Sequence, residues 1–148
     1  MINFEHIYGW EYTLLEPNHF WSHVPPKVAP YYHFFNAPVS EKKRDTLSVQ
    51  RFIEEVAKPD DFVAFKLDID SPFIEIPIAL ELLKDTKFSS LVDEFFFELH
   101  FHCELLLKCA WGNLPAKGTF PELPLDRYHA LEYFRQLREI GIRAHIWP

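Results

Sequence analysis

The chain has 148 residues, of which 48% are hydrophobic and 17% aromatic, so it can fill the core of one domain spanning residues 1–148. Its formal net charge of -7, with no dense basic block beyond Lys42-Lys43-Arg44, argues against nucleic acid as a partner. No apolar run reaches the roughly 18 residues of a membrane span, and the first residues lack a basic segment, so we expect a soluble, cytoplasmic protein without a membrane span.

The first third of the chain predicts two short strands separated by a loop. Residues 4–14 are rich in aromatic and branched residues and indicate a strand that ends near Glu11 or Tyr12. Residues 17–30 contain four prolines, which remove backbone donors, so we expect an irregular loop there. The aromatic run 31–36 predicts the second strand.

An amphipathic helix is predicted next. Four apolar residues recur at the spacing of one helical face: Val49, Phe52, Ile53 and Val56. Asp45 or Thr46 can cap the start of this helix, and Pro59 lies just beyond its end.

The run 60–70, Asp-Asp-Phe-Val-Ala-Phe-Lys-Leu-Asp-Ile-Asp, is typical of a strand that is buried on both faces. In such a strand alternate residues share a face, so Lys66, Asp68 and Asp70 lie on one side. Ligands of open α/β sheets bind outside the carboxyl ends of the strands, which is where Asp68 and Asp70 would lie.

The remainder of the chain alternates between helices and strands. A helix is expected to start near Ile76 with Pro77 in its first turn. Residues 91–102 alternate as a strand, residues 103–111 allow a short helix, and residues 112–125 form a loop rich in glycine and proline. A final helix then starts at Asp126 and ends at Gly141, before a strand over residues 142–147. Cys103 and Cys109 form neither a Cys-x-x-Cys pair nor a dense framework, so no zinc site or disulfide is predicted.

This order of strands and helices predicts an α/β fold with a mostly parallel sheet and right-handed crossovers. Asp68 and Asp70 could orient a substrate, hold a cation or act as a base, although Asp68 could instead pair with Lys66. Glu98, His100 and His102 share one face of their strand and are the ligand types of a metal site. Alternate residues of a strand also simply face solvent, so we assign no metal to them.

The sequence from Asp61 to Glu75, Asp-Phe-Val-Ala-Phe-Lys-Leu-Asp-Ile-Asp-Ser-Pro-Phe-Ile-Glu, resembles the FkbM-like family of S-adenosylmethionine-dependent methyltransferases. In that family a strand of the form Lys-Ile-Asp-Val-Glu-Gly is followed closely by a glutamate. Residues 46–52 resemble the helix that precedes this strand, and residues 92–100 resemble the strand that follows it. Trp10-Glu11 ends a strand where the family places an acidic residue on the ribose of the cofactor.

The chain departs from this family at the cofactor loop. Methyltransferases of this fold begin with a central strand and a glycine-rich turn, whereas the four glycines of this chain form no cluster: Gly9, Gly112, Gly118 and Gly141. The resemblance therefore implies a Rossmann-like methyltransferase sheet that lacks its first strand. That strand would lie between the strands of residues 5–12 and 62–70. These two strands could pair directly, or a partner chain or a second copy could supply the missing one.

The function implied by the resemblance is the transfer of a methyl group from S-adenosylmethionine to a hydroxyl of a sugar, glycan or small metabolite. Glu11 would hold the cofactor ribose and Asn36 would lie near the adenine. Asp68, Asp70 and His100 would face the acceptor.

Two other functions stay open at the level of sequence. The domain could be a non-catalytic interaction module that keeps the sheet without the cofactor. Asp68-Ile69-Asp70 could also be the Asp-x-Asp motif of a nucleotide-sugar glycosyltransferase, which holds a divalent metal.

Overall fold

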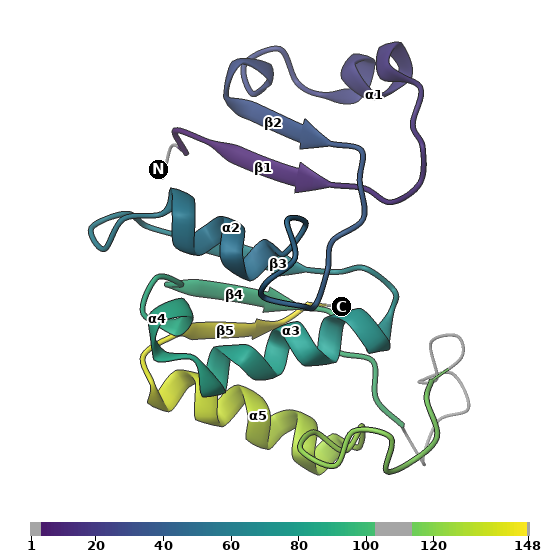
Figure 1. Cartoon of the computed structure of the whole chain (residues 1–148), viewed down its shortest axis with the longest axis vertical. Coiled ribbons are helices and arrows are strands. Elements are labelled where there is room, and N and C mark those ends of the chain that lie inside the picture. The colour runs from purple at the N-terminus through teal and green to yellow at the C-terminus, as the bar shows by residue number, and fades with distance from the viewer. Residues whose placement is uncertain (1–3, 103–113, 148) are drawn as a thin grey trace.

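The computed structural model describes residues 4–102 and 114–147, in which parallel strands alternate with helices (Figure 1). The strands are β1 (Ile7–Trp10), β2 (Tyr32–Phe35), β3 (Ala64–Leu67), β4 (Glu94–Phe97) and β5 (Arg143–Ile146). The helices are α1 (Pro17–His23), α2 (Val49–Val56), α3 (Pro72–Lys84), α4 (Thr86–Ser89) and α5 (Arg127–Glu139), with a 3-10 turn, η1 (Ala29–Tyr31), before β2. The fold is therefore α/β, with parallel sheets flanked by helices, and is compatible with a Rossmann-like fold. The helix predicted over residues 103–111, with Cys103 and Cys109, lies outside the described residues.

The larger sheet has the order β3-β4-β5, with both pairs parallel. One of its faces is buried and carries Phe65, Leu67, Phe95, Phe97 and Ala144. The Phe97 ring lies 6.2 Å from the ring of Tyr133 and 6.5 Å from that of Phe134, both on α5. The Tyr133 hydroxyl donates a hydrogen bond to the Ala79 carbonyl at 2.7 Å, which joins α5 to α3 across the core.

The opposite face of this sheet is open, which corrects the expectation that β3 is buried on both faces. Burial alternates along β3, so that Phe65 and Leu67 are buried while Ala64 and Lys66 are exposed. On this open face Lys66 Nζ lies 4.5 Å from the centre of the Trp147 ring. The apolar run of residues 60–70 is therefore divided between a face in the core and a face that carries a charged side chain.

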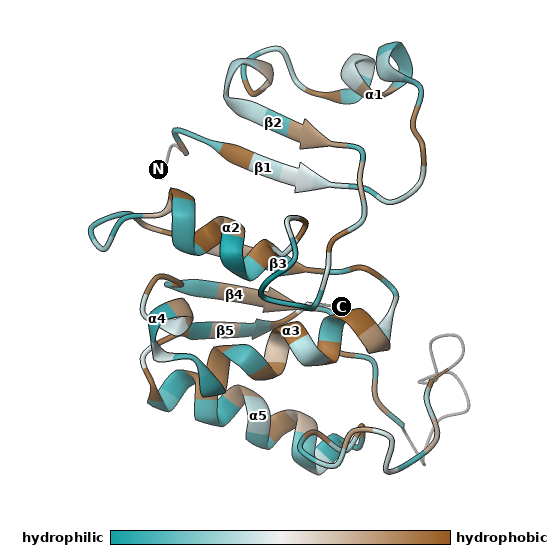
Figure 2. Ribbon diagram, viewed as in Figure 1, coloured by the Kyte–Doolittle hydropathy of each residue, from teal (hydrophilic) through white to brown (hydrophobic). Residues whose placement is uncertain are grey.

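The smaller sheet pairs β1 with β2 in parallel and packs through aromatic rings. On one face the ring of Phe52, from α2, meets the rings of Tyr8 and Trp10 edge-on at 4.9 Å each. On the other face Phe20, from α1, stacks on Phe34 at 3.8 Å. Figure 2 shows hydrophobic and hydrophilic patches alternating along α2, as its predicted stripe requires.

The two sheets lie side by side without forming a common ladder. The order of strands in the described residues breaks between β1 and β3, and nearly all Cα atoms of these two strands are more than 8 Å apart. Paired strands are only about 4.8 Å apart. At one end of the break the rings of Phe4 and Phe62 lie 6.3 Å apart. This break lies where the sequence analysis expects a strand to be missing.

The loop predicted over residues 17–30 is wrong for its first part, where α1 forms. The Glu16 carboxylate accepts hydrogen bonds from the backbone N–H groups of Asn18 at 3.1 Å and His19 at 2.7 Å. Pro17 occupies the first helical position, where a missing N–H costs nothing. The proline therefore starts this helix instead of preventing it.

Two element boundaries and one whole helix also differ from the predictions. The cap of α2 is Ser48, whose side chain accepts the Arg51 N–H, in place of Asp45 or Thr46. Helix α3 begins at Pro72 instead of near Ile76 and includes Pro77 in its interior at the loss of one backbone hydrogen bond. Helix α4 was not predicted.

The strand predicted over residues 91–102 is confirmed only for β4, Glu94–Phe97. The cause lies in the neighbouring strand β5, which ends at Ile146. The last bond between these segments is donated by the Trp147 N–H to the Phe97 carbonyl at 3.0 Å, so residues beyond Phe97 lose their partner on that side.

Among residues 4–102 and 114–147, no helix combines the length and apolar character that crossing a membrane requires.

Candidate functional site

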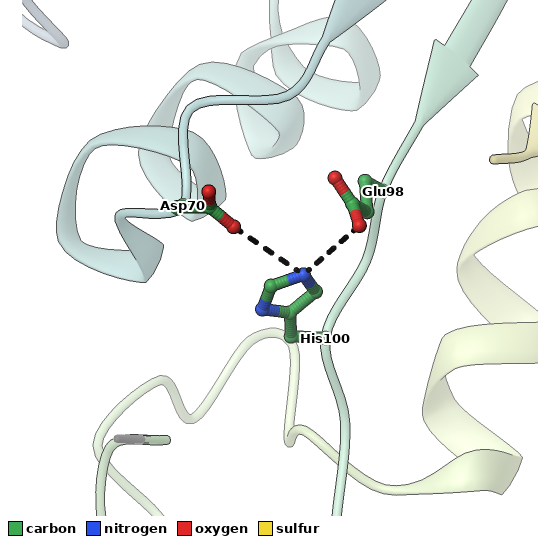
Figure 3. Close-up of side chains that lie close together, drawn as sticks. All are labelled: Asp70, Glu98 and His100. Atoms are coloured by element: carbon green, nitrogen blue, oxygen red, sulfur yellow. Dashed lines mark ion pairs between the residues drawn. The ribbon is translucent and has the colours of Figure 1, made fainter. Parts of the chain in front are cut away.

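Three of the predicted site residues meet where β3 and β4 end. Figure 3 shows Asp70, from the segment after β3, and Glu98 and His100, from the segment after β4, pointing toward one another. The Nε2 atom of His100 lies 3.5 Å from Oε1 of Glu98 and 3.9 Å from Oδ1 of Asp70. The His100 side chain is only 10% exposed, whereas that of Asp70 is 80% exposed. The cluster therefore has a buried base and a solvent-facing acid.

The turn that carries Asp70 is held in an uncommon conformation. Asp70 has a φ of 58°, in the left-handed region that aspartate enters more readily than most residues. The preceding N–H, that of Ile69, donates to Oε1 of Glu75 at 2.9 Å. Glu75 lies in the first turn of α3 and is 3% exposed. Its carboxylate thus ties the turn of Asp70 to the start of α3.

Glu75 has an unusual protonation equilibrium. Burial raises the pKa of its carboxyl above the ordinary value of 4.5, and the hydrogen bond from the Ile69 N–H and the nearby His100 oppose this rise. A buried acid with a raised pKa beside other titratable groups is a common feature of functional sites.

Asp68 lies at the same edge and has two partners. Lys66 Nζ is 2.6 Å from its Oδ2, which is the structural pairing considered in the sequence analysis. The neighbouring carboxyl of Glu98 and the bond from Lys66 lower the pKa of Asp68, while the neighbouring carboxyl of Asp68, together with desolvation, raises the pKa of Glu98. Glu98 is therefore the carboxyl of this pair that holds a proton to higher pH.

The arrangement offers two kinds of chemistry. A hydroxyl placed beside His100 could donate its proton to Nε2, which is the atom of the imidazole that faces the two carboxylates. The same three side chains could also hold a cation, since one ligand atom of each lies within 4.8 Å of the others.

Glu11 and Asn36 lie on the other sheet, at the carboxyl ends of β1 and β2. Oε1 of Glu11 accepts the Thr13 N–H at 2.6 Å. The Asn36 amide nitrogen donates to the carbonyls of Glu11 and Thr13 at 2.8 and 2.7 Å, and its oxygen accepts the Leu15 N–H at 2.8 Å. Asn36 therefore clamps the loop after β1, and its amide is engaged in that clamp.

His102, a candidate metal ligand in the sequence, is not part of the cluster. Its Nε2 lies 3.0 Å from the Pro115 carbonyl, and its backbone N–H donates to the Leu125 carbonyl. The alternation that would place it beside His100 ends with β4, so the side chain turns to the loop before α5 instead.

An apolar cavity of about 470 Å³ lies away from these residues, between α1 and the sheet of β1 and β2. Ile7, Phe20 and Val24 contribute to its lining, with His19 and His23 as its polar members. This cavity could not be predicted from the sequence, because it depends on helix α1, which was not predicted.

Glu75 is the residue that the sequence reasoning left without a role. It was part of the stretch that resembles a methyltransferase motif, but no function was assigned to it. A stronger signal was present in the sequence, where Glu75 is the only charged residue in the run Pro-Phe-Ile-Glu-Ile-Pro-Ile-Ala-Leu. A lone acid within such a run must be buried with a partner or lie at a helix start.

The fold and site together define an α/β protein of parallel strands with a carboxylate and histidine cluster at the strand ends. Comparison of the chain with models of protein families, with curated proteins and with solved structures gives no match.

Proposed function

We propose that the chain is a methyltransferase-like domain of the FkbM-like type, which methylates a hydroxyl of a sugar or small metabolite with S-adenosylmethionine. The observation that carries this proposal is the meeting of Asp70 and His100, with Asp68 beside them, at the ends of adjacent parallel strands. These are the residues expected to face the acceptor, and strand ends of this kind are where α/β sheets bind ligands.

In this function His100 is the base. The acceptor hydroxyl would donate its proton to Nε2, whose neighbours at 3.5 and 3.9 Å are carboxylate oxygens of Glu98 and Asp70. Asp68, already paired with Lys66, would accept a second hydroxyl of the acceptor and so orient it.

The described residues fit only part of the cofactor. Glu11, at the carboxyl end of β1, could accept hydrogen bonds from ribose hydroxyls. The Asn36 amide is committed to the loop after β1, so the adenine contact expected of it is not supported. Neither described glycine with a positive φ, Gly118 or Gly141, follows a strand as the cofactor turn requires. We therefore derive no step that passes through the cofactor.

Calorimetric titration of the purified chain with S-adenosylmethionine tests this proposal. We expect saturable heat at high micromolar ligand, and weaker binding for Glu11→Gln. The matched control is Asp60→Asn, which removes one exposed carboxylate before β3 and should leave binding unchanged. Absence of heat in the unaltered chain would remove the methyl-transfer function for this chain.

A second candidate function is an interaction module completed by a strand from a partner chain. The observation that favours it is the pair of open edges at the break between the sheets. Alternate residues of a strand direct their backbone N–H and C=O groups to opposite edges. The Glu11 N–H donates to the Phe35 carbonyl, so the backbone groups of Tyr8 and Trp10 point away from β2. The carbonyls of Val63 and Leu67 accept hydrogen bonds from the β4 side. The backbone N–H and C=O groups of Ala64 and Lys66 therefore point to the opposite edge, toward β1.

One extended segment could pair with both edges. A strand midway between β1 and β3 needs about 9.6 Å between them, or twice the spacing of paired strands. The arrows of β1 and β4 point the same way in Figure 1, and β3 is parallel to β4, so the segment would run parallel to both neighbours. Every strand of the described residues is already paired on at least one edge, so a second copy could supply one of these strands only by opening its own sheet.

Hydrogen exchange measured by NMR tests the open edges. The Lys66 amide should exchange at least about a hundredfold faster than that of Phe65, which faces β4. Equal protection of these two amides in a chain that light scattering shows to be monomeric would mean that the edge is closed, and would refute this candidate.

A further inference from the structure

We infer that Asp70, Glu98 and His100 bind a divalent first-row transition metal ion. Their three ligand atoms come from two neighbouring segments and lie within 4.8 Å of one another (Figure 3). Two of them are carboxylate oxygens and the third is the imidazole nitrogen Nε2, which faces both carboxylates.

The distances suit a shared cation better than direct hydrogen bonds. The separations of 3.5 and 3.9 Å between Nε2 and the two oxygens exceed the usual hydrogen-bond length of about 2.7–3.2 Å. Two ligands at about 2.0–2.2 Å from a metal lie roughly 2.8–3.6 Å apart in tetrahedral or octahedral geometry. Glu98 and His100 are already at this spacing. Asp70, which is 80% exposed, has room to move the few tenths of an ångström toward Nε2 and up to about 1 Å toward the Glu98 carboxylate, since the ligand atoms lie within 4.8 Å of one another.

The surroundings favour a cation. Glu75 adds a fourth carboxyl to those of Asp68, Asp70 and Glu98 at this edge, and Lys66 is the cation paired with Asp68. The cluster differs from an ordinary group of surface acids because a nine-tenths buried imidazole is one of the ligands. Its position is fixed by the segment after β4, whose Glu98 N–H donates to the Leu67 carbonyl at 3.2 Å.

The ligand set selects the metal. Imidazole suits zinc, iron and nickel, whereas carboxylates also accept manganese, so a mixed set favours Mn²⁺ through Zn²⁺ over Mg²⁺ or Ca²⁺. Three protein ligands leave coordination positions open on the solvent side, at Asp70. Nε2 of His100 cannot hold a metal and accept the acceptor's proton at once, so the metal-bound form is distinct from the base role in the proposed function, and binding of the metal itself does not depend on that function.

Titration of the metal-free chain with Mn²⁺ and with Zn²⁺, followed by calorimetry and by the electron paramagnetic resonance of Mn²⁺, tests the site. We expect one saturable site per chain and a loss of affinity of at least about tenfold in Asp70→Asn, Glu98→Gln and His100→Ala. Asp70→Asn is the decisive variant, because so exposed a side chain can be changed without disturbing the fold. Circular dichroism and the melting temperature verify the fold of each variant.

His129→Ala is the matched control. His129 Nδ1 lies 2.7 Å from Oδ2 of Asp126, an ordinary hydrogen-bonded pair at the start of α5, so its loss should not change metal affinity. The inference is wrong if the unaltered chain binds neither ion at about 1 mM, or if Asp70→Asn binds as tightly as His129→Ala. Metal binding is measured without S-adenosylmethionine, so its failure is distinct from failure of the methyl-transfer proposal.

Discussion

Replacing Glu75 tests how the candidate site is held together. The change to alanine removes the acceptor of the Ile69 N–H, a bond of 2.9 Å at a residue that is 3% exposed. An N–H left without a partner in such a place costs about 1–3 kcal/mol. Glu75→Gln keeps a carbonyl oxygen for this bond. Both variants lack the negative charge, so the difference between them reports the loss of the acceptor together with the loss of buried side-chain volume, and hydrogen exchange at Ile69 separates the two. We expect the free energy of unfolding of the alanine variant to be about 1–3 kcal/mol below that of the glutamine variant.

The difference in unfolding free energy between Glu75→Gln and the unaltered chain should also depend on pH. The pKa of Glu75 is raised in the folded chain, mainly by burial, so folding favours its protonated form. Its contribution to stability is fully present below the unfolded pKa of about 4.3 and is lost as pH rises through the folded value. A glutamine side chain does not ionise, so the Glu75→Gln variant does not lose stability in this way. The stability of Glu75→Gln relative to the unaltered chain should therefore increase as pH rises above about 4.5.

Urea unfolding followed by tryptophan fluorescence between pH 4 and 8 measures both effects, and hydrogen exchange at Ile69 reports the bond directly. The Ile69 amide should exchange faster in the alanine variant than in the glutamine variant. If the two variants unfold with free energies within about 0.5 kcal/mol of each other, Glu75 does not hold the turn of Asp70 and the reasoning fails.

Three further changes probe the scaffold by the same unfolding assay. Phe97→Ala, at a fully buried ring, should cost about 3–5 kcal/mol, whereas Phe73→Ala, at a side chain that is 61% exposed, should cost far less; similar costs would contradict the assigned core. Tyr133→Phe removes the hydrogen bond to Ala79 and should cost about 0.5–1.5 kcal/mol. Gly141→Ala, at a φ of 101° with open space around it, should cost about 1–2 kcal/mol from backbone strain alone, and no loss would place this turn in another conformation.

The order of elements was predictable because each depends on local spacing. The stripe of Val49 and Phe52 needs only the helical period, and α2 forms there because any packed helix must bury such a face. The extent of the elements was not predictable, because tertiary partners set it. Strand β4 stops at Phe97 where β5 stops, and α1 starts at Pro17 because the Glu16 side chain turns back onto its first N–H groups.

The candidate site, like the fold, was predictable in its location but not in all of its residues. The placement of Asp70 and His100 at one edge follows from parallel strands whose carboxyl ends coincide, which the sequence pattern already implied. The exclusion of His102 and the inclusion of Glu75 did not follow, because each depends on where a turn directs a side chain. The hydrogen bonds that the Asn36 amide makes within its own loop did not follow either, for the same reason.

The proposed site has an acceptor part and a cofactor part, and the break between the sheets lies between them. Asp70, Glu98 and His100 are fixed by β3, β4 and α3, which share one core, so this part is complete without any further strand. Glu11 is fixed by β1, which approaches that core through the ring of Phe52 on α2. The inferred metal site can therefore form whether or not the proposed cofactor binds across the break. Binding of a metal without binding of S-adenosylmethionine would leave the metal site in place and remove the methyl-transfer function for this chain.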